Sequence, residues 1–196
     1  MSQFDKNIYW VSTSDVPSEK SKEKNSGKSY SNRYEADIIK AILDKIQQDY
    51  ELSNLSKSVG VIAGYGSQIS VLEAAIAPKD KNFWKNLDIE IHTVDAFQGG
   101  ECDIIKYDLV RSNRQKKLGF TSDYRRLNVA LSRAKQLLII VGNDVMAYEG
   151  RTPKGVNNPF QPLIEYIDTH SNNCSRVDSS SLFVSQVVRF TIIIWP

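Results

Sequence analysis

A glycine, a lysine and a serine stand together at Gly27-Lys28-Ser29, the order in which a phosphate-binding loop ends. The full loop also needs an earlier glycine, because that residue makes the tight turn through which backbone amides converge on phosphate oxygens. Lys22 occupies that position, and the apolar run at 7–13 ends well before the segment. A match of three residues in the wrong context is a weak signal, so the sequence disfavours a phosphate loop here.

Two arginines offer a second way to bind an anion. Arg126 and Arg133 are seven residues apart in DYRRLNVALSRAKQLLIIVGN (123–143), which we interpret as a helix leading into a strand. At about 100° per residue they are nearly eclipsed, at the edge of an apolar stripe. Arginines held there fit an anion in a cleft, and equally fit structural pairs with carboxylates of neighbouring elements. Spacing alone leaves both interpretations open.

Paired glycines and a carboxylate form a third candidate, in HTVDAFQGGECDII (92–105). Glycines allow a backbone to approach a ligand closely, and Glu101 beside Gly99 and Gly100 offers a carboxylate for a hydroxyl group such as that of a ribose. The same residues also describe a hairpin with a charged tip. Both interpretations remain open at this point.

These residues need strands and helices to position them. Short β-branched apolar runs predict strands, and apolar residues at i, i+3, i+4 and i+7 predict helix faces. The predicted strands are 7–13, 59–64, 89–94, 102–110 and 136–143. The predicted helix faces are Ile39, Ile42, Leu43 and Ile46; Leu127, Ala130, Leu131 and Ala134; and Phe160, Leu163, Ile164 and Ile167. This alternation predicts a three-layer α/β domain with a mostly parallel sheet, whose ligands bind at the carboxyl ends of the strands.

Composition sets the outer limits. The chain has 196 residues, 41% hydrophobic content and a net charge of +2, so it suits one domain and permits nucleic-acid binding without demanding it. Two distant cysteines, Cys102 and Cys174, fit neither a disulfide framework nor a zinc site, and indicate a reducing compartment, cytoplasmic or nuclear. The longest apolar run, 137–141, is far too short for a membrane span, so a soluble protein is expected.

The domain is expected to cover residues 1–170. Within it, 14–31 is rich in serine and lysine and has no apolar periodicity, which predicts a solvated loop. Residues 171–196 pass from polar turn residues to an apolar end. That end fits either a last strand of the sheet or an altered terminus, and both interpretations remain open.

Several motifs in one order resemble a known family. VDAFQGGECDII (94–105), VRSN (110–113) and GFTSDYRRLNVALSRAKQLLIIVGN (119–143) are similar to motifs V and VI of superfamily 1 helicases. The branch is that of the nonsense-mediated-decay RNA helicase and senataxin. Upstream, SYSNRYEADIIKAI (29–42) resembles the start of the second RecA-like domain of that branch, and VGVIAGYGSQISVL (59–72) resembles its motif IV. The resemblance covers nearly all of the chain.

The resemblance implies a RecA-like, P-loop NTPase-type fold without its own phosphate loop, because nothing in the chain resembles the first RecA-like domain of these helicases. It implies that Arg133 is the motif VI arginine finger that meets the γ-phosphate of ATP across the domain cleft. Arg33 matches a second arginine with the same task. Glu101 matches the residue that contacts the ribose, on a turn shaped by Gln98 and Gly99.

The resemblance also assigns residues to a nucleic-acid strand. Tyr65 and Gln68 in motif IV and Thr93 near the start of motif V match positions that face the strand, and Arg111 is a candidate phosphate contact. Helicases of this kind mostly hold the backbone of the strand, so they read little sequence. No residue of this chain is expected to bind a metal.

The expected function is therefore that of the second motor domain of an ATP-dependent helicase or translocase. ATP with Mg²⁺ would be shared with a first RecA-like domain, in cis or in trans, and single-stranded RNA or DNA would be the other partner, with no membrane. The isolated chain should hydrolyse no ATP. Two alternatives are a non-catalytic RecA-like module that binds nucleic acid or protein, and a self-sufficient NTPase that uses Lys28 and Asp144.

Overall fold

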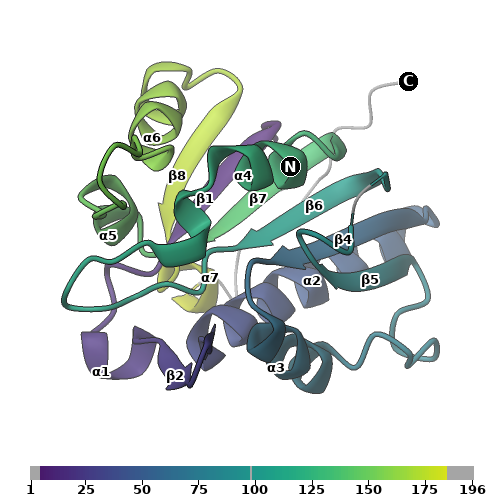
Figure 1. Ribbon diagram of the computed structural model, residues 1–196. Coiled ribbons are helices and arrows are strands. Elements are labelled where there is room, and N and C mark those ends of the chain that lie inside the picture. The colour runs from purple at the N-terminus through teal and green to yellow at the C-terminus, as the bar shows by residue number, and fades with distance from the viewer. Residues whose placement is uncertain (1–4, 98, 185–196) are drawn as a thin grey trace.

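The computed structural model describes residues 5–97 and 99–184, which form an α/β fold around one six-stranded sheet (Figure 1). Neighbouring strands are all parallel, in the order β5-β4-β6-β7-β1-β8. The predicted α/β class is confirmed, and each of the five predicted strands forms. The strands are β1 (Ile8–Ser12), β4 (Lys57–Ala63), β5 (Leu87–Thr93), β6 (Cys102–Asp108), β7 (Ala134–Gly142) and β8 (Cys174–Asp178).

Helices cover both faces of the sheet, so the domain has three layers (Figure 1). One face carries α2 (Arg33–Ser53), α3 (Gly66–Ile76) and α7 (Ser181–Val184), and the other carries α4 (Tyr124–Leu131), α5 (Asp144–Tyr148) and α6 (Phe160–Thr169). Each face has its own apolar core. Side chains alternate along a strand, which is why Tyr9 and Val11 of β1 belong to one core and Trp10 to the other.

The predicted helix faces of α2 and α6 are confirmed, because Ile39, Ile42 and Ile164 are buried. α2 begins where the Asn32 side chain accepts a hydrogen bond from the Glu35 amide. The same Asn32 side chain donates to the carbonyl of Val110, just beyond β6 (3.3 Å). The start of α2 is therefore fixed at the carboxyl end of β6.

The connection between β5 and β6 crosses β4. Both strands run parallel to β4, one on each side of it, so the chain must return from one end of the sheet to the other between Val94 and Glu101. The hairpin interpretation of this segment is therefore wrong, since a hairpin joins antiparallel neighbours. Phe97 of the connection packs over Gly60 of β4, where an added Cβ would come within 2.8 Å of the ring. The glycine makes room for the crossover.

α4 is shorter than the apolar pattern predicts. It ends at Leu131, and Ala134 is already the first residue of β7, paired with Cys102 of β6. The predicted helix face is therefore wrong at Ala134. Arg133 lies in the turn between helix and strand, so it is not eclipsed with Arg126. The sheet decides this boundary, because the Cys102 amide already donates to the Arg133 carbonyl (3.2 Å).

The segment 14–31 is more ordered than a solvated loop. It contains α1 (Ser18–Ser21) and an antiparallel hairpin of β2 (Lys24–Ser26) and β3 (Ser29–Ser31). Gly27, with φ of 77°, and Lys28 form the two-residue turn of this hairpin. The tripeptide Gly27-Lys28-Ser29 thus belongs to a hairpin, whereas a phosphate loop joins a strand to a helix.

The sheet continues past residue 170. β8 pairs with β1 in parallel and forms one edge of the sheet, and the apolar end at 185–196 lies outside the described residues. Cys102 and Cys174 are free and buried. No helix in the described ranges is long and apolar enough to cross a membrane.

Lys106 is buried in the middle of the sheet. Its side chain is fully buried, and its Nζ has no hydrogen-bond partner among the described residues. Burial lowers the pKa of this amine well below its ordinary value. The folded state then binds fewer protons than the unfolded state. Stability therefore falls as the pH drops from the unfolded lysine pKa, about 10.4, toward the lowered folded pKa.

Lys106→Met should stabilise the fold, because it keeps the length of the side chain and removes an unpaired buried amine. We expect the free energy of unfolding at neutral pH to rise by about 1–3 kcal/mol, and its increase with pH above neutrality to become shallower. Urea unfolding at a series of pH values measures both. The control Lys79→Met, at an exposed lysine, should change stability by less than about 0.5 kcal/mol. Destabilisation by Lys106→Met would contradict this account.

Candidate functional site

The parallel sheet gives the domain two ends, and the predicted site residues are divided between them. Tyr65, Thr93 and Arg111 lie at the carboxyl ends of β4, β5 and β6, or just beyond. Glu101 and Arg133 lie at the amino ends of β6 and β7. β6 has 7 residues, which at about 3.3 Å per residue separates the two ends by about 20 Å.

Glu101 and Arg133 are neighbours at the amino end. The amide of Cys102, the residue after Glu101, donates to the Arg133 carbonyl (3.2 Å). Glu101 is exposed and follows a turn in which Gly99 has φ of 91°, a conformation that glycine adopts without strain. Gln98 lies outside the described residues. The fold thus brings together two of the predicted nucleotide contacts from segments far apart in the sequence.

Arg133 has an unsatisfied donor. Its side chain is half-buried, and its Nε is shielded from solvent without a hydrogen-bond partner in the described part of the chain. A shielded donor costs free energy until a partner satisfies it, and an anion at this end would do so. Arg126 instead fits the interpretation as a structural arginine, because it pairs with the carboxylate of Asp95 on a neighbouring element (3.2 Å).

Arg33 does not join this group. It is the first residue of α2, whose cap Asn32 bonds to Val110 at the carboxyl end of β6. Arg133 lies at the opposite end of β6 and follows a helix on the opposite face of the sheet. Arg33 is exposed and pairs with Asp37 (2.9 Å). The two arginines therefore start from opposite ends of β6, because α2 begins where the strands end, and their shared contact with one γ-phosphate stays a prediction.

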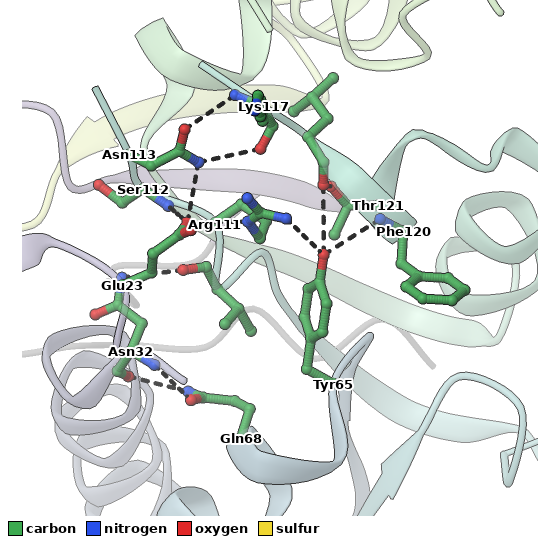
Figure 2. Close-up of polar contacts among 12 residues, drawn as sticks. Glu23, Asn32, Tyr65, Gln68, Arg111, Ser112, Asn113, Lys117, Phe120 and Thr121 are labelled. Atoms are coloured by element: carbon green, nitrogen blue, oxygen red, sulfur yellow. Dashed lines mark hydrogen bonds and ion pairs between the residues drawn. The ribbon is translucent and has the colours of Figure 1, made fainter. Parts of the chain in front are cut away.

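Arg111 is the centre of a buried polar cluster at the carboxyl end (Figure 2). Its Nε donates to Glu23 Oε2 (2.9 Å) and its Nη1 donates to the Tyr65 hydroxyl (3.0 Å). Its guanidinium also lies over the ring of Tyr30, 4.0 Å from the ring centre. The side chains of Arg111 and Glu23 are only 5% and 9% exposed, so removal of one would leave the other charge buried without compensation.

Tyr65 and Gln68 are buried as well. The Tyr65 hydroxyl accepts a hydrogen bond from the Phe120 amide (3.2 Å). The Gln68 side chain accepts one from the Asn32 amide (2.7 Å) and donates one to Asp108 Oδ2 (2.6 Å). These side chains therefore lie inside the domain, with their polar groups bound to protein (Figure 2). Their direct contact with a nucleic-acid strand stays a prediction.

Two buried carboxyl groups fix the backbone where β6 ends. The amide of Val110 donates to Glu35 Oε2 (2.7 Å) and to Asp108 Oδ1 (3.2 Å). Val110 has φ of 67°, and the Arg111 amide reaches back to the Leu109 carbonyl (2.7 Å), a γ-turn that is strained for a β-branched residue. Burial, with the charge of Asp108, raises the pKa of Glu35 well above its ordinary value. The two carboxyl groups together hold the turn that directs Arg111.

The exposed surface of the carboxyl end is formed by the turn after β5 and by the short helix η1 (Gly119–Ser122) with the start of α4. Phe120 is 59% exposed, and the Arg126 guanidinium lies 4.9 Å from its ring centre. The half-buried Thr93 and the exposed Asp95 lie in the turn. An exposed aromatic ring beside a cation suits a base of a single strand. Phe120 was not predicted, although the aromatic and basic residues of FTSDYRR are a signal for it.

No cluster of three His, Cys, Asp or Glu side chains within 5–97 and 99–184 could hold a metal ion. Asp144, the acidic residue of the self-sufficient alternative, accepts hydrogen bonds from the Ser12 hydroxyl (2.5 Å) and from Arg176 Nη1 (2.9 Å). Its carboxylate is therefore engaged in holding β1 and β8 to the start of α5.

Gly119→Ala tests the cluster around Arg111. Gly119 has φ of 60°, and a Cβ there would clash with Arg111 Nη1 and lie 2.9 Å from the Tyr65 hydroxyl. We expect a loss of about 1–2 kcal/mol from the backbone conformation and a further loss of about 1–3 kcal/mol from the displaced side chains.

Gly27→Ala is the matched control, because Gly27 has φ of 77° with nothing within 4 Å of an added Cβ. It should show the backbone loss alone. Urea unfolding of both variants gives the two free energies, and equal losses would show that no tight cluster surrounds Gly119.

Comparisons with known proteins identify the family. A family model described as an AAA domain matches residues 1–145. Helicase sen1 of Schizosaccharomyces pombe is 40% identical over 113 residues, which are 57% of this chain and 7% of that protein. The DNA polymerase alpha-associated DNA helicase A of Saccharomyces cerevisiae is 40% identical over 111 residues, 57% of this chain and 16% of that protein. Regulator of nonsense transcripts 1 of Dictyostelium discoideum is 41% identical over 119 residues, 60% and 9% of the two chains.

The chain therefore spans between 7% and 16% of the length of these three relatives. The family match includes Arg111, Glu101 and Arg133, and the parallel six-stranded sheet is that of a RecA-like domain. The chain belongs to the AAA-domain family and, within it, to the superfamily 1 helicase branch that includes helicase sen1 and the regulators of nonsense transcripts.

Proposed function

We propose that this chain is the second motor domain of an ATP-dependent nucleic-acid helicase or translocase. The observation that carries the proposal is the shielded, unpartnered Nε of Arg133 beside the exposed Glu101. A guanidinium that lacks a partner suits a phosphate, and a carboxylate on a glycine turn suits a ribose hydroxyl. The relatives named above as helicases support the same class of function.

The nucleotide would be held mainly by a first RecA-like domain, because Gly27-Lys28-Ser29 of this chain is a hairpin turn. ATP with Mg²⁺ supplies the phosphoryl group and part of the charge neutralisation when bound there. Arg133 would then enter the cleft and stabilise negative charge that spreads over the transferred group. An arginine finger of this kind contributes about 10³–10⁵ in rate, or about 4–7 kcal/mol.

The carboxyl end would hold the single strand. Phe120 and Arg126 offer a base platform and a cation, and the turn at Thr93 lies beside them. The buried cluster of Arg111 would support this surface from within. Closure of two RecA-like domains on ATP and their release after hydrolysis would move the strand in steps.

The isolated chain should hydrolyse no ATP, with or without a single-stranded oligonucleotide, because it lacks a phosphate loop. Phosphate release by the purified chain, beside a protein with a complete phosphate loop, measures this. Turnover stimulated by the strand and lost in Lys28→Ala would contradict the proposal and favour the self-sufficient NTPase.

Arg133→Ala should abolish catalysis in an enzyme that joins this domain to a first RecA-like domain. We expect kcat for ATP hydrolysis to fall by about 10³–10⁵, with little change in oligonucleotide affinity. Arg125→Ala, at an exposed arginine of α4, is the matched control and should leave kcat nearly unchanged. Unchanged kcat in Arg133→Ala would favour the non-catalytic module.

Arg33→Ala in the same enzyme tests the separation of the two arginines. Because Arg33 lies at the other end of β6 and pairs with Asp37, we expect a far smaller loss of kcat than in Arg133→Ala. Equal losses would show that Arg33 meets the same phosphate after all.

A further inference from the structure

An open basin lies at the carboxyl end of the sheet, beyond the surface formed by Phe120 and Arg126. Its volume is about 880 Å³, and its walls are the segments 14–25 and 111–117, with the start of α5 below them. Of the residues predicted to contact nucleotide or nucleic acid, only Arg111 lines this basin. We call it the basic basin, for the side chains described next.

Glu23 holds the two walls of the basic basin together (Figure 2). Its carboxylate accepts hydrogen bonds from Arg111 Nε (2.9 Å), from the Ser112 amide (2.8 Å) and from Asn113 Nδ2 (3.0 Å). Its own amide donates to the Ser112 carbonyl (3.0 Å). Because these contacts are buried, the spacing between the walls is set before any ligand arrives.

Asn113 shapes the second wall. Its side chain accepts a hydrogen bond from the Lys117 amide and donates one to the Lys117 carbonyl, both 3.0 Å. These bonds use the backbone of Lys117 and leave its ammonium group exposed. The loop therefore presents cations from a fixed backbone.

The basic basin concentrates positive charge in a chain whose net charge is only +2. Lys22, Arg114 and Lys117 line it, are exposed, and form no ion pair within the described ranges, although the carboxylate of Glu19 lines it as well and lies close enough to interact with the charges of Arg114 and Lys22. Lys116 also lines it but is paired with Glu149. These three cations outnumber the single carboxylate that is not already paired, so the hollow keeps an excess of positive charge, and an anion that lies between the cations relieves their repulsion.

The basic basin is linked to the proposed strand surface by contacts between aromatic rings. Tyr30 lines it, and the Tyr30 ring meets the Tyr65 ring edge to face with centres 5.3 Å apart. Tyr65 in turn meets the ring of Phe120, with centres 6.3 Å apart. The buried Tyr65 ring thus lies between the two surfaces and contacts a ring of each, and a chain that crosses the ends of β5, β4 and β6 would arrive at the basin over β7 and β1.

We propose that the basic basin binds the phosphodiester backbone of the single strand after it has passed the surface at Phe120, with Lys22, Arg114 and Lys117 as the phosphate contacts. This rests on the proposed function. Free cations beside an aromatic ring are the combination that single-stranded nucleic acid requires. An acidic peptide could also bind the cations, but it would not explain why the basin lies next to the strand surface at Phe120.

The triple variant Lys22→Ala/Arg114→Ala/Lys117→Ala tests the proposal. Anisotropy of a labelled single-stranded oligonucleotide, longer than about 16 nucleotides, gives the affinity of this chain across a salt series. Three lost phosphate contacts should reduce the slope of log affinity against log salt by about 2, and should weaken binding by about tenfold or more at low salt. The unfolding free energy should stay unchanged, because all three side chains are exposed.

The matched control is Lys79→Ala/Lys81→Ala/Lys85→Ala, which removes the same charge from exposed positions before β5, at the other end of the sheet. It should keep the wild-type slope. Equal losses of oligonucleotide affinity in the two triple variants would overturn the basin proposal, because they would show only a general effect of net charge.

Two further outcomes separate the basin from the proposed function. If wild type and the basin variant bind the oligonucleotide equally, the basin proposal fails while the strand surface stands. If the wild-type chain binds no oligonucleotide, the strand surface fails and the basin with it. Tighter binding of a polyglutamate peptide than of the oligonucleotide, lost in the basin variant, would overturn the proposal in favour of an acidic protein partner.

Discussion

The common direction of the six strands is the constraint on which the rest of the structure depends. In a parallel sheet each connection must return along the full length of a strand, so residues close in sequence can lie at opposite ends of the sheet. This places Glu101 and Arg133 at the amino ends of β6 and β7, and Arg111 at the carboxyl end of β6. The proposed nucleotide contact and the proposed strand surface are therefore separated by the length of one strand, and motion between domains must couple them.

The two ends are built differently, and the difference fits their proposed tasks. The carboxyl end is held by buried polar groups, in which Glu23 neutralises Arg111 and the carboxyl groups of Glu35 and Asp108 accept hydrogen bonds from the amide of a strained turn. Breaking such a network costs free energy, because it leaves buried polar groups unpaired. The network therefore holds the surface above it in one conformation. The amino end has glycines in its turn and a guanidinium donor without a partner. An unpartnered donor at this end fits the proposal that the site is shared with a second domain.

Local periodicity predicted the elements well, and it failed where pairing across the sheet decided the outcome. The strands and the faces of α2 and α6 follow from apolar spacing, because burial on one face imposes that spacing. The end of α4 does not, because Ala134 keeps the helical period but pairs with Cys102 as a strand residue. The hairpin interpretation of 92–105 failed for the same reason, since no local feature shows that β4 lies between β5 and β6.

By itself the sequence determined the α/β class, five of the strands of the sheet and, through motifs in a specific order, the helicase family. It also showed which residue types could bind phosphate, ribose and a strand. Only the tertiary structure decided which of them share a site: it joined Glu101 to Arg133, sent Arg33 to the other end of β6, and buried Tyr65 and Gln68. The physical reason is that spacing along a chain records which face of an element is buried, whereas the order and direction of strands arise from contacts between distant segments.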